Sequence, residues 1–126
     1  MNGTLANYAI VLGRLYNQGY TFSVYGIPPT GKQDNIYHYP YYGTRKQRSK
    51  IVRLFNAKIR QLCKKKGYHF IDIYPNAVGP NGLMAPKMAA DEVHLSSRIV
   101  PFVRSELDSH YSNLAGRQNA NNFNIL

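Results

Sequence analysis

The sequence is poor in acidic residues and cysteine, and each scarcity narrows what the protein can be. Six Asp and Glu stand against sixteen Lys and Arg, which gives a formal net charge of +10 at pH 7. A balance this basic indicates an anionic partner or a need for solubility, and it says little about the fold. Cys63 is the one cysteine, so an internal disulfide is excluded and no oxidising compartment is implied.

Long hydrophobic runs are also lacking. The longest strongly apolar run covers residues 9–12, which is far too short to span a bilayer. No signal peptide is visible, so we expect no membrane contact and leave the location open between a reducing compartment and an assembled particle. The residue pattern calls for no cofactor and no metal, and we expect neither. The 126 residues suffice for one domain and are too few for two.

What the sequence does contain is an alternation of helical and strand-like patterns. The expected elements, in order, are a helix over residues 4–18, a strand over 20–27, a helix over 45–66, a strand over 68–74 and a helix over 97–111. Strands that alternate with amphipathic helices are typical of an α/β layer with parallel strands. We expect residues 1–111 to form the folded domain. Residues 112–126 hold five asparagines and are expected to be a low-complexity tail.

Two segments between these elements could make contacts. Residues 45–66 lie within a stretch, from Asn35 to Ile71, that holds ten Lys or Arg and no acidic residue. A solvated face is the plain explanation, and an anionic surface or nucleic acid is the alternative partner. The preceding loop carries four tyrosines over residues 37–42. They could stack on a ligand, bury against another chain or pack as a lid, and the sequence leaves these alternatives open.

Asp91 and His94 are the candidate catalytic residues. In a loop, a spacing of three lets the carboxylate accept a hydrogen bond from Nδ1–H of the imidazole. That bond fixes the tautomer and leaves Nε2 free to act as a general base. Taken alone the spacing is a weak signal, and an ordinary surface histidine next to helix-entry residues is the alternative.

The ordered set of segments resembles the second half of an SGNH (GDSL-type) hydrolase, a family of small serine esterases and lipases with a flavodoxin-like sheet. The matching segments, in the family's order, are residues 7–8 (NY), 24–29 (VYGIPP), 55–59 (FNAKI), 70–74 (FIDIY) and 91–95 (DEVHL). The resemblance covers about residues 5–111. It implies a partial flavodoxin-like, three-layer fold with parallel strands flanked by helices, and it assigns Asp91 and His94 to the catalytic acid and base positions.

Important parts of that family's site have no counterpart in this sequence. The Gly-Asp-Ser turn with the nucleophile and the Gly-x-Asn-Asp block with oxyanion donors are both absent. None of the seven serines has a nucleophile-elbow context, and Glu92 stands where the family usually has glycine. Two parallel strands alone would also leave unpaired edges. We therefore expect the sheet to be completed by another polypeptide, an upstream segment or self-association.

Three functions follow from these observations. The first is the Asp/His-bearing part of an SGNH-type serine ester hydrolase, inactive alone and completed by a serine from elsewhere. The second is a catalytically inactive, SGNH-like structural or interaction component of a larger assembly, for example a virus particle. The third is a basic nucleic-acid-binding module, which no recognised motif supports.

Overall fold

The computed structural model describes residues 2–33, 35–36, 39–40 and 42–123. Its helices and strands are α1 (Asn2–Asn17), β1 (Ser23–Tyr25), β2 (Asn35–Ile36), β3 (Tyr39–Pro40), α2 (Arg45–Lys66), β4 (His69–Ile71), α3 (Tyr74–Ala77) and α4 (Val100–Phe123). Short 3-10 turns occupy Pro86–Met88 and Ser97–Ile99. No helix within these ranges is long and apolar enough to cross a membrane.

The central feature is a pair of parallel strands. β1 pairs with β4 in a register that sets Val24 opposite Phe70, and α2 connects the two strands. The predicted parallel neighbours are therefore confirmed. The protein has a small α/β fold, whose main sheet has two strands in the described part of the chain.

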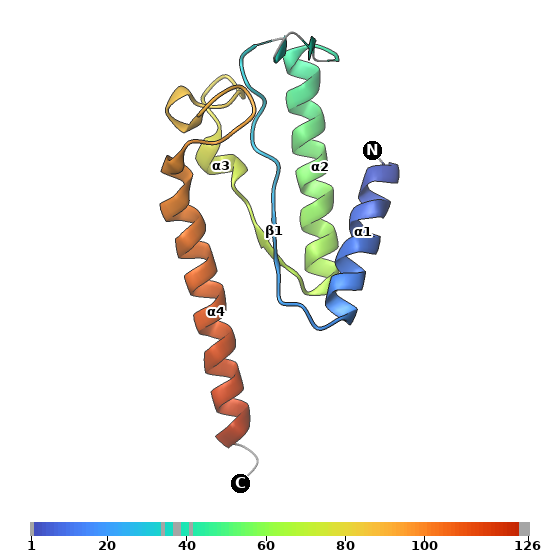
Figure 1. Ribbon diagram of the computed structural model, residues 1–126, viewed down its shortest axis with the longest axis vertical. Helices are drawn as coiled ribbons and strands as arrows, with labels where there is room; N and C mark the ends of the chain where they lie inside the picture. Colours follow the sequence, from blue (N-terminus) through green and yellow to red (C-terminus); the bar gives the residue numbers. More distant parts are fainter. Residues whose placement is uncertain (1, 34, 37–38, 41, 124–126) are drawn as a thin grey trace.

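Helices cover both faces of this sheet. α1 and α2 lie on one side of the strands and α4 lies on the other (Figure 1). On the α1–α2 side, Leu12, Val24 and Phe55 belong to one buried cluster. On the α4 side, Ile71 and Ile99 belong to a second cluster. Alternation along the strands explains this division, because successive side chains point to opposite faces.

The boundaries of α2 agree with those predicted from the sequence, since both ends carry strong signals. Thr44 accepts a hydrogen bond from the Gln47 N–H, and the Gln47 side chain accepts one from the Thr44 N–H, which completes a capping box. At the other end Gly67 adopts a left-handed conformation, with φ of 74°, and its N–H bonds the carbonyl of Cys63. Glycine adopts this conformation without the cost of a Cβ atom.

Three expectations about these elements were wrong. The strands pair over three residues each, Ser23–Tyr25 and His69–Ile71, and not over the whole of the predicted ranges. Tyr74 begins α3 instead of ending a strand, since Pro75 suits the first turn of a helix. The loop before α2 contains the short antiparallel pair β2–β3. Tyr37, His38 and Tyr41 of that loop lie outside the described residues.

The helix expected to end at Tyr111 continues to Phe123. Residues 112–123 of the expected tail are therefore helical. Extending an existing helix adds one backbone hydrogen bond for each residue fixed, so the extension needs no packed face of its own. Consistent with this, most side chains described after residue 110 are exposed to solvent.

Candidate functional site

The loop that carries Asp91 and His94 lies beyond the carboxyl ends of the two parallel strands, next to α3 (Figure 1). Ala89 and Leu95 form an antiparallel bridge across its base. Inside this bridge the Ala90 N–H donates to the carbonyl of His94 at 2.9 Å. Backbone hydrogen bonds alone therefore hold the two ends of this loop together.

Asp91 holds His94 through both oxygens of its carboxylate. Oδ2 lies 2.7 Å from Nδ1 of the imidazole, while Oδ1 accepts the backbone N–H of Val93 at 2.8 Å and that of His94 at 2.7 Å. The hydrogen bond expected from the spacing is thus present. With Nδ1 engaged by the carboxylate, Nε2 is left as the second nitrogen of the ring.

The same contacts favour the charged carboxylate. The Val93 N–H, the His94 side chain and the His94 N–H, in that order, lower the pKa of Asp91 to about 2. Asp91 is therefore ionised at neutral pH and stabilises a positive charge on the ring. The His94 side chain is 70% exposed, and no described residue forms a hydrogen bond with Nε2. The ring can accordingly receive a proton from a group that approaches from outside the described chain.

Glu92 ties this loop to the chain that follows β1. Its Oε2 accepts the backbone N–H of Gln33 at 2.8 Å. Gly31 lies against Glu92 so closely that a Cβ atom at position 31 would overlap both its backbone and its carboxylate. Glu92 therefore holds the loop of Asp91 and His94 against the chain that follows β1.

The segment of residues 27–31, called here the 27–31 segment, is itself fixed to α2. The Asn56 side chain accepts the Ile27 N–H at 2.7 Å and donates to the Ile27 carbonyl at 2.8 Å. Further along, the carbonyl of Thr30 accepts the Met84 N–H at 2.8 Å. Between this segment, α2 and Val93 lies a cavity of about 470 Å³ with mostly apolar walls. An apolar cavity therefore adjoins the candidate site.

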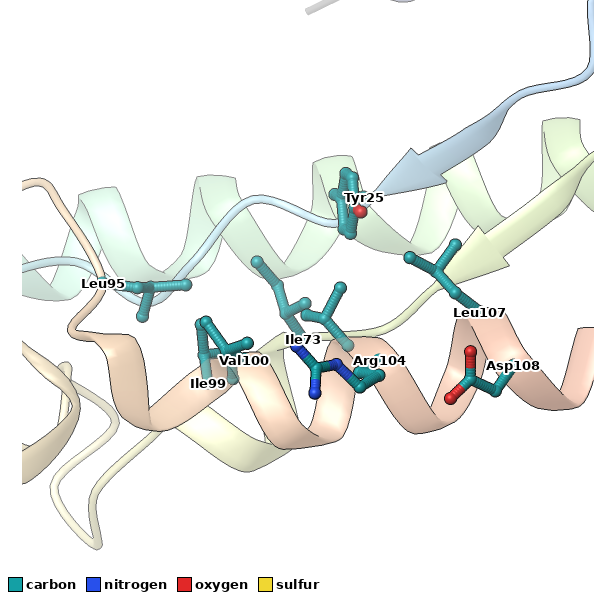
Figure 2. Close-up of a pocket in the computed structure, with 9 residues that line it drawn as sticks. Tyr25, Ile73, Leu95, Ile99, Val100, Arg104, Leu107 and Asp108 are labelled. Atoms are coloured by element: carbon teal, nitrogen blue, oxygen red, sulfur yellow. The ribbon is translucent and has the colours of Figure 1, made fainter.

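A second apolar recess, of about 500 Å³, lies between α4 and the outer side of β1 (Figure 2). Tyr25 borders it on the strand, Leu107 borders it on α4, and Arg104 and Asp108 stand at its rim. Tyr25 remains 46% exposed, because α4 packs over β4 and leaves the corresponding face of β1 open. The described sheet is therefore only partly covered on this side.

The structure also reveals a serine–histidine pair that sequence reasoning missed. Ser23 Oγ lies 2.8 Å from Nδ1 of His69, and the His69 ring stacks on His110 with centroids 3.7 Å apart and an interplanar angle of 2°. The available signal was that Ser23 and His69 lie in the two strands that the sequence predicts to be parallel neighbours. Both residues begin their strands, so this cluster lies at the end of the sheet opposite to Asp91 and His94.

This second pair lacks what nucleophilic catalysis needs. Burial, followed by the charge of His110, lowers the pKa of His69, while Glu106 opposes them by charge alone. No described carboxylate accepts a hydrogen bond from the His69 ring and so orients it, since Nδ1 is already engaged by Ser23. We therefore assign the cluster to the contact between β4 and α4.

None of the seven serines forms a hydrogen bond with His94. Ser49 donates to the Gly82 carbonyl at 3.3 Å and Ser96 to the Lys87 carbonyl at 3.0 Å. The described residues also include no group of three side chains that could hold a metal ion. The arrangement offers an oriented general base without a nucleophile beside it.

The basic residues of α2 lie apart from this pair. Lys46, Lys50, Arg53 and Lys64 are exposed on the helix. Arg60 forms an ion pair with Asp72, just beyond the stretch without acidic residues. Arg60 is therefore balanced locally, and the exposed lysines and arginines of α2 contribute to the basic character of this surface.

The comparisons with known proteins bear on the fold. No known protein family matches the sequence, and no curated protein matches it. A solved structure from Streptococcus pneumonia, provisionally named as a platelet activating factor, is similar with a TM-score of 0.67 and 13% sequence identity. The match covers 86% of this chain and 50% of that one, so this chain spans about half the length of its structural neighbour. At this identity the likeness shows a shared fold alone.

Proposed function

We propose that this chain contributes the acid and general base of an SGNH-type serine ester hydrolase, whose nucleophile and oxyanion hole come from another polypeptide or segment. The observation that carries the proposal is the bond of 2.7 Å between Asp91 Oδ2 and His94 Nδ1, on a ring that is 70% exposed. A carboxylate that pointed away from the imidazole could not orient the ring as a general base. The partial flavodoxin-like arrangement belongs to the same proposal.

The chemistry assigned to the pair is acyl transfer. His94 Nε2 takes the proton of an incoming serine hydroxyl while the serine oxygen attacks the ester carbonyl carbon. The proton then passes from Nε2 to the leaving alcohol, and an acyl-enzyme remains. A water molecule, deprotonated by the same nitrogen, attacks this acyl group and releases the acid and the serine. Asp91 positions the ring and stabilises its positive charge at each transfer.

The second polypeptide or segment is expected to pair with the open edge of β1. The carboxyl ends of parallel strands meet at one edge of a sheet, so a strand parallel to β1 would deliver its following turn near His94. The recess beside Tyr25 and α4 would receive side chains from such a strand (Figure 2). A neighbour on β1 would also cover the unpaired edge of the described sheet.

Similarity in fold also supports this proposal. The structural neighbour shares the fold over 86% of this chain, and half of that protein has no counterpart here. A hydrolase divided between two polypeptides or segments is compatible with that length difference.

The test is complementation. The purified chain is mixed with a segment of an SGNH hydrolase that carries Gly-Asp-Ser and Gly-x-Asn-Asp, and release of acid from glyceryl triacetate is followed. An ester of an aliphatic alcohol is preferred, because free imidazole attacks activated phenyl esters. Turnover is expected only from the mixture.

The matched variants are His94→Ala in the site and His110→Ala in the stacked pair outside it. The first should abolish turnover, and the second should leave it intact. Turnover that survives His94→Ala would overturn the assignment of the general base. A well-formed complex without turnover would instead favour an inactive, structural component of an assembly.

A further inference from the structure

We infer that the cavity between α2 and the 27–31 segment binds the unbranched, apolar acyl group of the ester. This inference rests on the proposed function for its biological meaning, although binding itself is independent of catalysis. The cavity measures about 470 Å³, a size at which preformed pockets hold small organic ligands. It would give the proposed hydrolase a preference among acyl chains.

Its position favours this ligand. Val93 lines the cavity and directly precedes His94, and its N–H bonds Asp91. An acyl chain in the cavity would therefore leave its carbonyl end beside the oriented imidazole. Three of the large apolar side chains that the fold leaves exposed converge here, namely Ile27 at 37%, Ile51 at 55% and Val93 at 38%. Covering them with an apolar group removes them from water, which is favourable.

The walls are held rigidly, so little ordering is needed on binding. Asn56 fixes both backbone groups of Ile27, and Pro28 and Pro29 restrict the chain that follows. At the far end Gly31 is held against Glu92. Preformed walls lower the conformational cost of binding, which distinguishes this cavity from an accidental gap between loops.

Charge is confined to one end of the cavity. Arg48 donates to the carbonyl of Gln33 at 3.1 Å, and Glu92 accepts the N–H of the same residue at 2.8 Å. The cationic and anionic side chains thus meet around Gln33. Apart from Thr30, the remaining side chains of the walls, including Ile51 and Val52 of α2, are apolar. Such walls offer few hydrogen-bonding groups to a sugar, a nucleotide or a peptide, and they suit a hydrocarbon chain.

The other apolar recess is a different kind of surface. It borders the open edge of β1 and runs along α4 (Figure 2). A backbone edge beside an apolar groove fits an added strand, whereas the cavity on α2 borders no unpaired strand edge. Val103 in the recess and Val52 in the cavity are both partly buried helical valines. They therefore provide matched positions for a test.

The test uses the full chain and two neutral probes, hexanamide and octanamide, which avoid attraction to the basic surface and hydrolyse slowly. Methyl NMR signals of Ile51, Val52 and Val93 should shift on titration. Octanamide should bind more than about tenfold tighter than hexanamide, because each buried methylene strengthens binding about fourfold. Val52→Phe should weaken octanamide binding at least about tenfold by filling the cavity, while Val103→Phe should leave it unchanged.

Ile51→Asp supplies a second variant, because its exposed side chain can be replaced without disturbing the core, and it should also weaken binding. Shifts confined to Val103 and Leu107, an undiminished affinity in both cavity variants, or absence of binding would overturn the inference. His94→Ala should bind octanamide normally. If the chain binds octanamide but fails complementation, the proposed function is wrong and the inference about the cavity stands. If turnover depends on His94 but octanamide does not bind, the proposed function stands and the inference about the cavity is wrong.

Discussion

Asn56 of α2 bonds both backbone groups of Ile27, with distances of 2.7 Å to the N–H and 2.8 Å to the carbonyl oxygen. The last hydrogen bond between the β1 side and β4 runs from the Gly26 N–H to the Ile71 carbonyl. Beyond the paired strands, the Asn56 side chain therefore supplies the hydrogen bonds that hold the backbone of Ile27. Through this contact a buried helix residue determines how the chain leaves the sheet and where the cavity wall stands.

We expect Asn56→Ala to lower the free energy of unfolding by about 2–4 kcal/mol, since it leaves two backbone groups of a partly buried segment without their partner. Asn56→Asp should also destabilise the fold, because it keeps the acceptor for the Ile27 N–H but sets a buried carboxylate oxygen against the Ile27 carbonyl in place of the donor. Asn113→Ala, an exposed position on α4, is the control and should have little effect. Urea denaturation measures all three. Equal stabilities for Asn56→Ala and the control would contradict this account of the segment.

Gly31→Ala tests the contact between the 27–31 segment and the loop that carries Asp91 and His94. The added methyl group would overlap the backbone and carboxylate of Glu92, so we expect a loss of about 1–3 kcal/mol and altered signals from Val93 and His94. Gly13→Ala in α1 is an informative control, because nothing lies within 4 Å of its Cβ position. That change should stabilise the protein by about 0.5–1 kcal/mol. Destabilisation of similar size in both variants would argue against a specific contact.

The ionisation of Asp91 gives a pH-dependent prediction. Its pKa in the folded chain is about 2, below its ordinary value of 3.8, so the stability it contributes is present above pH 3.8 and is lost as the pH falls through 2. Carboxyl-carbon NMR should show this midpoint in the wild type. His94→Ala should raise the pKa only in part, because the largest contribution comes from the Val93 N–H. An unchanged midpoint in His94→Ala would mean that the side chains do not interact in solution.

The stacked pair of His69 and His110 predicts a second effect of pH on the free energy of unfolding, in a pH range different from that of Asp91. Burial and the neighbouring His110 lower the pKa of His69 from 6.5 in the folded chain. The unfolded chain therefore binds the proton first, and stability that is full above pH 6.5 is lost as the pH falls below that value. Unfolding free energies between pH 7.5 and 5 should show this decline.

Two variants should change this loss of stability with falling pH in opposite directions. His110→Phe keeps an aromatic partner and removes the charge, so the decline should become shallower. Glu106→Gln removes the group that favours the protonated ring and should make the decline steeper. Identical pH profiles in the two variants and the wild type would show that the stack does not control the titration.

The sequence allowed prediction where local signals were strong. Gly67 marked the end of α2 in the sequence, and the alternation of elements indicated parallel strands, which the pairing of β1 and β4 confirms. The spacing of Asp91 and His94 predicted their hydrogen bond, because only two residues of loop lie between them. Local contacts of this kind depend on short stretches of chain, so their patterns can be read in sequence.

Contacts between distant segments could not be predicted in the same way. Asn56 and Ile27 are 29 residues apart, and Ser23 and His69 are 46 apart. Their partners depend on the strand register and on how α2 packs, and neither is encoded in local periodicity. The cavity between α2 and the 27–31 segment is of this kind, since its walls come from three separated segments. The extension of α4 to Phe123 was missed for another reason. Asparagine favours turns over helix interiors, so the asparagine-rich sequence predicted a tail, and the prediction did not consider that an existing helix can continue through such residues.

The central claim is that His94 activates a serine that belongs to another polypeptide or segment, and covalent labelling tests it most directly. A fluorophosphonate reacts with a serine only when a neighbouring base has activated it. In the complemented assembly, the probe should label the serine-bearing segment with the wild-type chain and with His110→Ala. Labelling should fall at least about a hundredfold with His94→Ala. Equal labelling with wild-type and His94→Ala chains in an intact assembly would contradict the claim.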